Sequence, residues 1–337
     1  MDKFEACGLE ISARELVVAW SGKKAAVQLL RFANDAAGHR SLLRTLTRGG
    51  KRVRVVMEAT GLYGLDVALA LSAAAGVAVM VANPRAVRNF ARAMMQRSKN
   101  DPLDALVLRE FALRMPFRGW QRPSANRLAL WAIARRLKAL SELCSAEKNR
   151  LHAMKQSQAT PAIVRQDIVR NLRWQERAMN KLRREARQCI AAEAELQRRY
   201  QLMLSAPGIA ERSALQILGE LVMLPEDRDV RQWVAFAGLD PSEHSSGQSV
   251  RKRPRLSKAG NRHLRQALYM PALVCIRWEP HLFGFYQHLL ERGKAKKQAL
   301  LAVARKLLHA LYGMFRHNQP YDGTLVYRLP AQKVLEA

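Results

Sequence analysis

The sequence has few cysteines, and they lie far apart. Its 337 residues include four of them, with no CxxC pair, and its eight histidines form no HxxxH or HExxH motif. Zinc sites and disulfide frameworks depend on such closely spaced ligands. We therefore expect neither a zinc site nor disulfides, and we expect all four cysteines to be reduced: Cys7, Cys144, Cys189 and Cys275.

Long apolar runs are also missing. The apolar stretch at residues 67–81 is interrupted by Gly and Ser, and it falls short of the roughly 20 residues that a membrane-spanning helix needs. The first eight residues form no apolar signal region. We expect a cytoplasmic protein with no membrane partner.

Acidic residues are scarce beside basic ones. The chain has 28 Asp and Glu against 57 Lys and Arg, a net charge of +29, while 49% of its residues are hydrophobic. Such an excess of positive charge on a chain that is apolar enough to fold indicates a polyanionic partner. The composition therefore favours a folded protein that binds nucleic acid.

The first third of the chain alternates short β-type runs with helical ones. Three strands followed by alternating helix and strand is the order of a mixed α/β sheet with helices on its faces. The patterns predict strands at residues 5–11, 15–22, 25–32, 52–60 and 77–84, and helices at 36–50, 61–76, 84–96 and 101–115.

The rest of the chain is predicted to be helical. Beyond a Pro- and Gly-containing linker at 115–124, an extended helical pair breaks at 158–162 and is typical of a coiled-coil arm or dimerisation spacer. Residues 202–221 read as helix, Pro-Gly-Ile turn and helix, a helix-hairpin-helix arrangement whose turn amides would face a phosphate. Further helices are expected at 231–241, 263–278 and 296–315, with a Gly/Ser-rich basic loop before 263 and no clear signal after 323.

Four acidic residues stand where a sheet could bring them together. Glu10 lies in the first predicted strand and Glu58 ends the fourth, while Asp101 and Asp104 share one face at the start of a helix. If the first and fourth strands are neighbours, these carboxylates converge. A basic protein has little reason to gather four acids except to hold hard divalent cations such as Mg²⁺ or Mn²⁺.

Simpler interpretations compete for three of these acids. Asp101 would serve as the N-cap of its helix, with Pro102 at the first helical position and Asp104 in the first turn. Glu58 would cap the helix that follows its strand. Glu10 is harder to explain in this way, because an ionised carboxylate inside an apolar strand is costly unless something pairs with it.

A serine-rich, strongly basic segment covers residues 242–265. No acid occurs between Glu243 and Glu279. Backbone amides of a Ser/Gly segment and Arg side chains suit phosphate contact, and a serine among these cations is a candidate nucleophile toward phosphorus. A solvated basic loop is the alternative. The cations of this region are Arg251, Lys252, Arg253, Arg255, Lys258, Arg262, Arg265 and Arg277.

Taken in order, these motifs resemble a known family. The stretches "GLEIS", "MEATGLYG", "ANPRAVRNFARA" and "SKNDPLDA", followed by "PGI", "FAGLDP" and "SSGQSVRKRPRLSKAGNRHLRQALYMPA", resemble the insertion sequence 110 family of transposases, which includes the Piv-type invertases. The resemblance runs from about residue 7 to about residue 322. It implies an RNase H-like (RuvC-like) DEDD domain over 1–118, a helical coiled-coil region over 119–200, and a C-terminal transposase domain over 201–325, followed by a tail at 326–337.

The resemblance also implies the site residues. The DEDD set falls on Glu10, Glu58, Asp101 and Asp104, where Glu10 stands in place of the Asp that is usual in the family, and the nucleophilic serine falls on Ser246, before Gly247. Ser245 and Ser249 are the neighbouring alternatives for the serine. Members of the family act on double-stranded DNA, and some are guided by a structured bridge RNA.

These considerations predict a serine recombinase of the prokaryotic nucleoid. Ser246 would form a 5′-phosphoserine link while the four acids hold Mg²⁺. Cations beside the serine would hold DNA or guide-RNA phosphates, namely Arg251, Lys252, Arg253, Lys258, Arg262 and Arg265. The family and the helical arm imply a dimer that assembles into a tetramer on DNA. The alternatives are a metal-only RuvC-like nuclease or resolvase, and a non-catalytic nucleic-acid-binding protein with a degenerate acid site.

Overall fold

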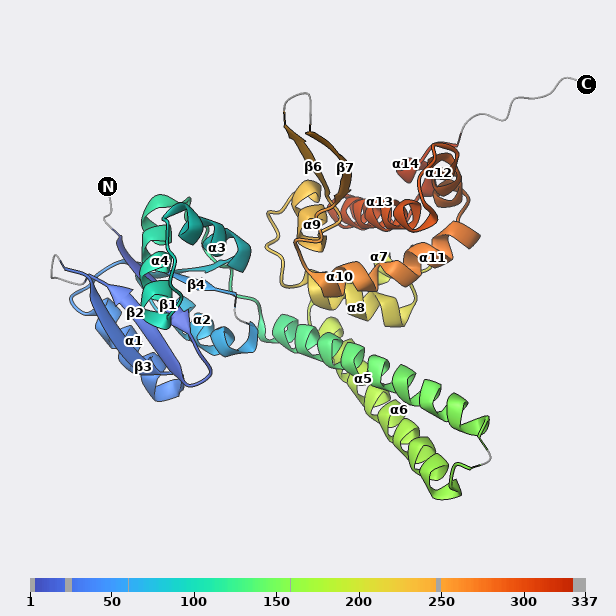
Figure 1. Ribbon diagram of the computed structural model, residues 1–337, viewed down its shortest axis with the longest axis horizontal. Helices are drawn as coiled ribbons and strands as arrows, with labels where there is room; N and C mark the ends of the chain where they lie inside the picture. Colours follow the sequence, from blue (N-terminus) through green and yellow to red (C-terminus); the bar gives the residue numbers. More distant parts are fainter. Residues whose placement is uncertain (1–3, 22–25, 60, 158, 247–249, 330–337) are drawn as a thin grey trace, which may run out of the picture. The chain divides into compact units, whose positions relative to one another are not determined.

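The chain forms two compact units, Met1–Arg122 and Pro123–Ala337 (Figure 1). The computed structural model describes residues 4–21, 26–59, 61–157, 159–246 and 250–329, and the side chains at 243–254 lie outside this described part. No helix among the described residues has both the length and the apolar character needed to cross a membrane. The two units are described separately below.

The first unit is built on a five-stranded mixed sheet in the order β3-β2-β1-β4-β5. β1 pairs antiparallel with β2 and parallel with β4, so the first and fourth strands are neighbours, which is the condition on which the predicted convergence of the acids depends. The predicted mixed α/β organisation of this region is confirmed. The strands are β1 (Glu5–Ile11), β2 (Glu15–Trp20), β3 (Gln28–Ala33), β4 (Val53–Glu58) and β5 (Val77–Ala82).

Helices cover both faces of this sheet, and the apolar strand sequences reflect it. Val55 belongs to a core cluster that includes Leu42 and Leu71, whereas the next residue, Val56, belongs to another that includes Phe111. Successive strand residues point to opposite faces, so a strand that is apolar at both is buried on both sides. The helical elements are α1 (Ala36–Thr47), η1 (Gly61–Gly64), α2 (Leu65–Ser72), α3 (Pro84–Ala93) and α4 (Asp101–Arg114).

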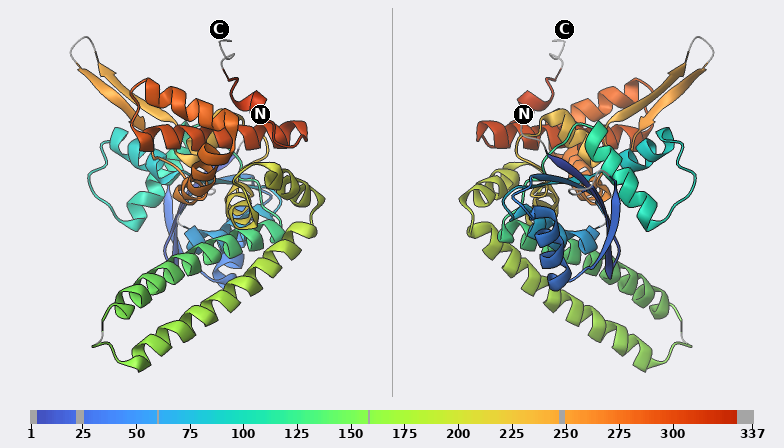
Figure 2. Two further views of the ribbon diagram at one scale, coloured as in Figure 1. Left: turned by 90° about the vertical axis from the view of Figure 1, so that its right-hand side faces the viewer. Right: turned by 90° about the vertical axis from the view of Figure 1, so that its left-hand side faces the viewer.

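The second unit begins with two long helices, α5 (Ala125–Lys155) and α6 (Ala162–Ala191), which lie side by side (Figure 2). The predicted break between them is confirmed, because α6 starts directly after Pro161. Between the helices the Cys144 thiol donates a hydrogen bond to Gln175 Oε1 at 2.8 Å, and both residues are buried. The coiled-coil and dimerisation role of this pair stays a prediction.

Most of the remaining helices contact α13, which buries an almost continuous apolar stripe. They share one hydrophobic cluster with α5 and α6, since Leu137 and Met179 belong to the same core as Leu307. The predicted boundary near residue 200 stays a prediction. These helices are α7 (Ala194–Ser205), α8 (Glu211–Leu221), α9 (Val230–Ala237), α10 (Arg262–Ala267), α11 (Tyr269–Trp278), α12 (Pro280–Glu291), α13 (Lys296–His317) and α14 (Gly323–Val326).

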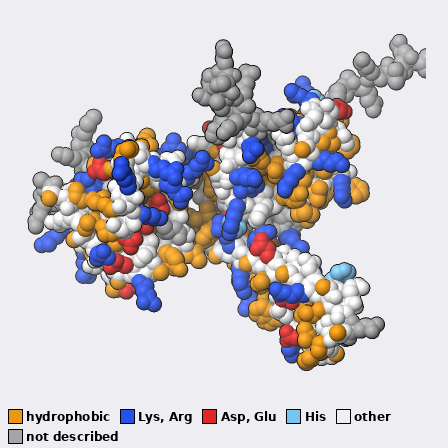
Figure 3. Space-filling model, in the orientation of Figure 1, with side chains coloured by type: hydrophobic (Ala, Val, Ile, Leu, Met, Phe, Trp, Pro, Cys, Tyr) orange, Lys and Arg blue, Asp and Glu red, His pale blue; other side chains and the backbone are white. Residues whose placement is uncertain are grey.

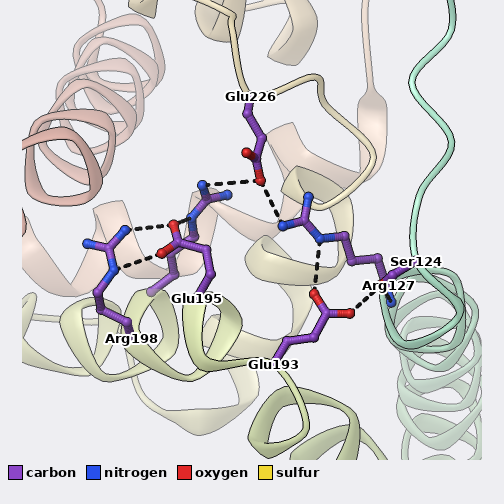
Figure 4. Close-up of polar contacts among 7 residues, drawn as sticks. Ser124, Arg127, Glu193, Glu195, Arg198 and Glu226 are labelled. Carbon is purple, nitrogen blue, oxygen red and sulfur yellow. Dashed lines mark hydrogen bonds and ion pairs between the residues drawn. The ribbon is translucent and has the colours of Figure 1, made fainter.

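Ion pairs fix the start of α5 to neighbouring elements of the same unit (Figure 4). The Arg127 guanidinium donates to Glu193 at 3.3 Å, just before α7, and to Glu226 at 2.7 Å in the loop after α8. Glu195 accepts from Arg198 through both carboxylate oxygens, at 2.6 and 2.8 Å. Arg127 is 18% exposed and Glu193 is 23% exposed, so this pair is better shielded from solvent than an ordinary surface pair.

The structure corrects two predictions for the second unit. A β-hairpin of β6 (Pro241–Ser246) and β7 (Val250–Leu256) occupies most of the predicted Gly/Ser-rich loop. Its serines, cations and Pro254 give no apolar alternation, which is the pattern on which strand prediction depends. The predicted helix 263–278 is divided at Leu268, because Pro271 cannot donate to the carbonyl of Ala267, where α10 ends. No element was predicted for α12.

Candidate metal centre and nucleic-acid interface

Glu10 lies on β1 between two buried residues, Leu9 and Ile11. The pKa of its carboxyl group is raised to about 7, first by burial and then by the nearby negative charges of Asp104, Glu58 and Asp101. All four predicted acids therefore contribute to one electrostatic cluster. Burial and mutual repulsion both disfavour the ionised form of Glu10, and a positive counter-charge at the cluster would oppose them.

Gly8 allows α4 to approach β1 closely enough to deliver its two aspartates. A Cβ atom at position 8 would lie 2.0 Å from the carbonyl oxygen of Ala105 and 2.3 Å from the amide nitrogen of Arg109. Gly8 and Glu10 are two apart on the strand and thus face the same side of the sheet. The first turn of α4, with Asp101 and Asp104, consequently lies near Glu10.

Asp101 is not the cap of α4, so that alternative interpretation is wrong. The N-cap is Asn100, whose side chain accepts a hydrogen bond from the amide of Leu103 at 2.9 Å. Pro102 then stands at the second helical position, not the first. Within the part of the chain that the structure describes, the carboxylates of Asp101 and Asp104 make no hydrogen bond or ion pair, and this leaves them available to a ligand.

Glu58, the last residue of β4, does not cap the helix that follows. The N-cap of α2 is Gly64, and α2 has no side-chain cap. The pKa of Glu58 is raised by burial and by Asp104, and is lowered by Lys99 and Arg88. The pKa of Asp104 is raised by burial, and Lys99 opposes this shift.

The donor set of this cluster suits a hard divalent cation. Four carboxylates supply only oxygen ligands, and positive charge would relieve the mutual repulsion of the cluster and the desolvation of Glu10, Glu58 and Asp104. Among the described residues, no group of three or more acidic, His or Cys side chains already stands at metal-binding distances. The carboxylates are close enough to repel one another, but in this arrangement they do not stand together as a group of metal ligands.

Lys99 and Arg88 were not predicted as members of this cluster. Both are exposed, and Lys99 acts on Glu58 as well as on Asp104. Their sequence signal is weak, because cations are common throughout this chain. Only the proximity of the loop before α4 and of α3 to the end of β4 distinguishes them.

Ser246 is the last residue of β6, where its backbone pairs with Val250 of β7. Ser245 precedes it on the same strand, while Gly247 and Ser249 lie outside the described residues. Ser246 therefore lies at the end of β6 that adjoins the connection between the two strands of the hairpin. The side chains of Ser246, Arg251, Lys252 and Arg253 also lie outside the described part.

The other predicted cations differ in their surroundings. Lys258 and Arg262 are exposed, and Lys258 has a left-handed backbone with φ of 51°. Arg265 is partly buried, and its guanidinium donates to the carbonyl oxygen of Ala237 at the end of α9, at 2.8 Å. Arg265 thus has a structural partner, whereas no ion pair within the described chain engages Lys258 or Arg262.

A partly buried hydrogen-bond network fixes the start of α10, where Arg262 lies. Glu220 is 3% exposed and accepts hydrogen bonds from Arg135 Nε at 2.7 Å and from Asn261 Nδ2 at 2.6 Å. Asn261 in turn caps α10 by accepting from the amides of His263 and Leu264. The carboxylate of α8 therefore fixes the residue that immediately precedes Arg262.

The Pro-Gly-Ile turn between α7 and α8 packs against α11 on one side. A Cβ atom on Gly208, whose φ is 78°, would lie 2.7 Å from the carbonyl oxygen of Pro271. The Cys275 thiol donates to the carbonyl oxygen of Pro207 at 2.9 Å. The helix-hairpin-helix assignment and its phosphate contact stay predictions.

Basic side chains are spread over the exposed face of the protein that Figure 3 shows. On the face shown in Figure 3, Lys and Arg side chains greatly outnumber those of Asp and Glu. This matches the sequence excess of 57 basic over 28 acidic residues and favours association with a polyanion.

Two regions of the chain match known families of transposases. Residues 200–287 match the family described as "Transposase IS116/IS110/IS902 family", and residues 7–157 match the DEDD domain of IS110 elements, described as "Transposase". The pilin gene-inverting protein of Moraxella bovis is 28% identical over 272 residues, covering 80% of this chain and 82% of that protein, and the protein of the same name from Moraxella lacunata gives the same values. The "Insertion element IS110 uncharacterized 43.6 kDa protein" of Streptomyces coelicolor is 31% identical over 139 residues, covering 40% of this chain and 32% of that protein.

The two matched regions contain the predicted metal ligands and the predicted nucleophile, respectively. The DEDD match covers Glu10, Glu58, Asp101 and Asp104, and the second match covers Ser246. The acidic cluster of the first unit, the basic hairpin region of the second and these similarities lead to one conclusion: the chain belongs to the IS110 family of transposases, which are enzymes of DNA recombination.

Proposed function

We propose that this transposase cuts and rejoins DNA with Ser246 as the nucleophile and with divalent cations held by the acidic cluster. The observation that carries the proposal is the convergence of Glu10, Glu58 and Asp104, whose carboxyl pKa values are all raised, within the DEDD region. Asp101 adds a fourth charge to the same cluster.

The first role of the cluster is to bind Mg²⁺ or Mn²⁺. Glu10, Glu58, Asp101 and Asp104 are the ligands, and their repulsion falls when they share a cation. A bound divalent ion supplies positive charge that stabilises the developing charge on phosphoryl oxygens. Lys99 keeps Asp104 and Glu58 more readily ionised, which prepares both carboxylates for this role.

The second role belongs to the hairpin. Ser246 Oγ loses its proton and attacks the scissile phosphorus, the P–O3′ bond breaks, and the leaving oxygen takes a proton to give a free 3′-OH. The products are a 5′-phosphoserine link and that 3′-OH. Attack by the 3′-OH of a second strand reverses the step and frees the serine, so rejoining needs no ATP.

Nucleic-acid binding is assigned to the basic residues near the hairpin and α10. Arg251, Lys252, Arg253, Lys258 and Arg262 contact phosphates, while Arg265 supports the end of α9. The partners are double-stranded DNA at two exchanging sites and a structured guide RNA. Strand exchange at two sites requires at least two serines, which favours a dimer that assembles into a tetramer on DNA.

The relatives suggest the kind of rearrangement. The two Moraxella proteins are named for inverting a pilin gene, and inversion and insertion can both be produced by cutting and rejoining two DNA sites. Under this proposal the present chain performs such an exchange on the ends of an element and a target site.

Covalent trapping tests the proposal directly. Purified protein is incubated with DNA and with the RNA that co-purifies with it, and adducts are resolved under denaturing conditions. Ser246→Ala should abolish the adduct, while Ser245→Ala and Ser249→Ala should retain it. Cleavage that survives Ser246→Ala would instead support a metal-only nuclease, and binding without cleavage by any variant would support a non-catalytic protein.

A further inference from the structure

A cavity of about 290 Å³ opens among α5, α6, α8 and the junction of α10 with α11, all within the second unit. Its apolar lining comes from α5, α6 and α8, where Leu137, Met179 and Leu215 are buried and Leu172 is partly buried. The cavity is close to the lower end of the roughly 300–1,000 Å³ range of small-ligand sites. Its size therefore suits one small ring system better than a helix.

Cations surround this apolar lining. Lys138, Lys148, Arg183 and Arg212 line the cavity, against a single acid, Glu176. Lys138 pairs with Glu142 at 3.1 Å, and Arg183 donates to Asn180 Oδ1 at 2.6 Å. Within the described chain, Lys148 and Arg212 form no ion pair. These two cations are available to an anionic group at the mouth.

Uncommitted polar groups complete the lining. The side chains of Ser213 and Gln266 make no hydrogen bond to other described residues. Gln216 uses its Nε2 to donate to the carbonyl oxygen of Ala134 at 3.0 Å, and this fixes the orientation of its amide group. A ring whose edge carries hydrogen-bond donors and acceptors could therefore pair with these side chains while its face packs on the apolar lining of the cavity.

We propose that this cavity holds a single unstacked nucleotide of single-stranded DNA, with its base on the apolar lining and its phosphate between Arg212 and Lys148. The inference rests on the proposed function, because strand exchange separates base pairs and leaves bases without their stacking partners. An unpaired base costs least to extrude, and the transfer into an apolar pocket offsets that cost. The excess of cations over acids favours a polyanionic occupant over an apolar protein segment.

The test uses a short single-stranded DNA with one 2-aminopurine, a base whose fluorescence rises when it leaves the stack. The protein is the full chain carrying Ser246→Ala, in EDTA, so that neither covalent chemistry nor metal contributes. Binding is followed by anisotropy and base insertion by 2-aminopurine intensity. Failure of the cutting mechanism therefore leaves this experiment unaffected.

Two kinds of variant separate the pocket from general charge. Arg212→Gln should weaken binding by about tenfold, the effect of losing one charge-assisted contact. Arg183→Gln should weaken binding more than Arg184→Gln, which removes the same charge from the adjacent, exposed residue outside the cavity. Ser213→Leu fills the cavity without changing charge, and it should abolish the fluorescence rise while most of the anisotropy change remains.

Three results would overturn the proposal. One is an unchanged fluorescence rise in Ser213→Leu together with equal losses in Arg183→Gln and Arg184→Gln. Another is a rise with RNA of the same sequence and none with DNA. The third is a change in sedimentation of the protein alone in Ser213→Leu with no effect on DNA, which would assign the cavity to contact between copies of the chain. Circular dichroism of each variant checks that it folds.

Discussion

The missing side chain of Gly8 places β1 in direct contact with the backbone of α4, since a Cβ atom there would lie 2.0 Å from the carbonyl oxygen of Ala105. This contact brings the strand that carries Glu10 close to the helix that carries Asp101 and Asp104. The acidic cluster depends on a close backbone approach as much as on the acids themselves.

Gly8→Ala should therefore disrupt the cluster without altering any acid. Forcing a methyl group into this contact should cost about 1–3 kcal/mol of stability and move α4 away from β1. We expect a lower Tm and weaker Mg²⁺ binding by calorimetry. Gly119→Ala is the matched control, because a Cβ atom at position 119 meets nothing within 4 Å. Unchanged Mg²⁺ binding in a folded Gly8→Ala protein would contradict this account.

The pKa of Glu10, raised to about 7 by burial and by its acidic neighbours, makes the stability of the metal-free protein depend on pH. The folded protein holds this proton more tightly than the unfolded chain does. The contribution is thus fully present below the ordinary pKa of 4.5 and is lost as the pH rises through about 7. In EDTA, Tm should fall between about pH 5 and about pH 8, and the fall should be smaller in Glu10→Gln.

Replacing Glu10 by the shorter acid tests its role as a ligand. Glu10→Asp supplies the residue usual in the family and should raise the rate of DNA cleavage, measured in single-turnover assays with Mg²⁺. Glu10→Ala should abolish cleavage while DNA binding remains, because the residue is outside the basic region. If Glu10→Ala cleaves DNA at the rate of the unchanged protein, Glu10 is not a ligand.

Lys99 should determine how readily Asp104 and Glu58 ionise, because it lowers the pKa of both. In Lys99→Gln both pKa values should rise further, so Mg²⁺ affinity at neutral pH should fall and recover at higher pH. The comparison is with Arg97→Gln, another exposed cation of the same loop that does not act on either acid. A loss of affinity that is independent of pH would contradict the electrostatic explanation.

Glu220 links the core of the second unit to the basic loop through Asn261. Glu220→Ala removes the acceptor of Arg135 and Asn261 and should cost about 1–3 kcal/mol of unfolding free energy, because Asn261 loses a partly buried hydrogen bond while the 36% exposed Arg135 stays hydrated. Asn261→Ala removes only the cap of α10, which should cost about 1 kcal/mol. If the network positions Arg262, both variants should also weaken DNA binding. The loss of affinity should increase with the loss of amide-exchange protection at residues 257–263.

The sequence predicted the sheet better than the hairpin. The apolar residues of β4, such as Val55 and Val56, fit burial on both faces, so the strand followed from pattern. The pairing of β1 with β4 was only a condition of the predicted acid cluster, and it is seen in the structure. β6 and β7 pair through backbone hydrogen bonds, which residues such as serine and arginine can also form. Because these strands have no alternation of apolar residues, the sequence pattern did not predict them.

Individual side chains were harder to assign than elements. Asn100 rather than Asp101 caps α4, a difference of one residue that local preferences do not resolve. Arg265 contacts Ala237 because α9 and α10 meet in the fold, and nothing in the composition separates it from Arg262. Lys99 and Arg88 likewise become members of the acidic cluster only through tertiary proximity.

The single hydrophobic cluster shared by α5, α6 and α13 limits how such proteins can exchange parts during evolution. If the genes of two relatives recombined near residue 200, the product would combine one part of this core from each parent. The side chains of the two parts would not have been selected to pack against each other. A crossover near Arg122, where one compact unit ends and the next begins, would leave each hydrophobic core cluster of the described residues within its own parent. New combinations of acidic domain and serine domain are thus most accessible through that short connecting segment.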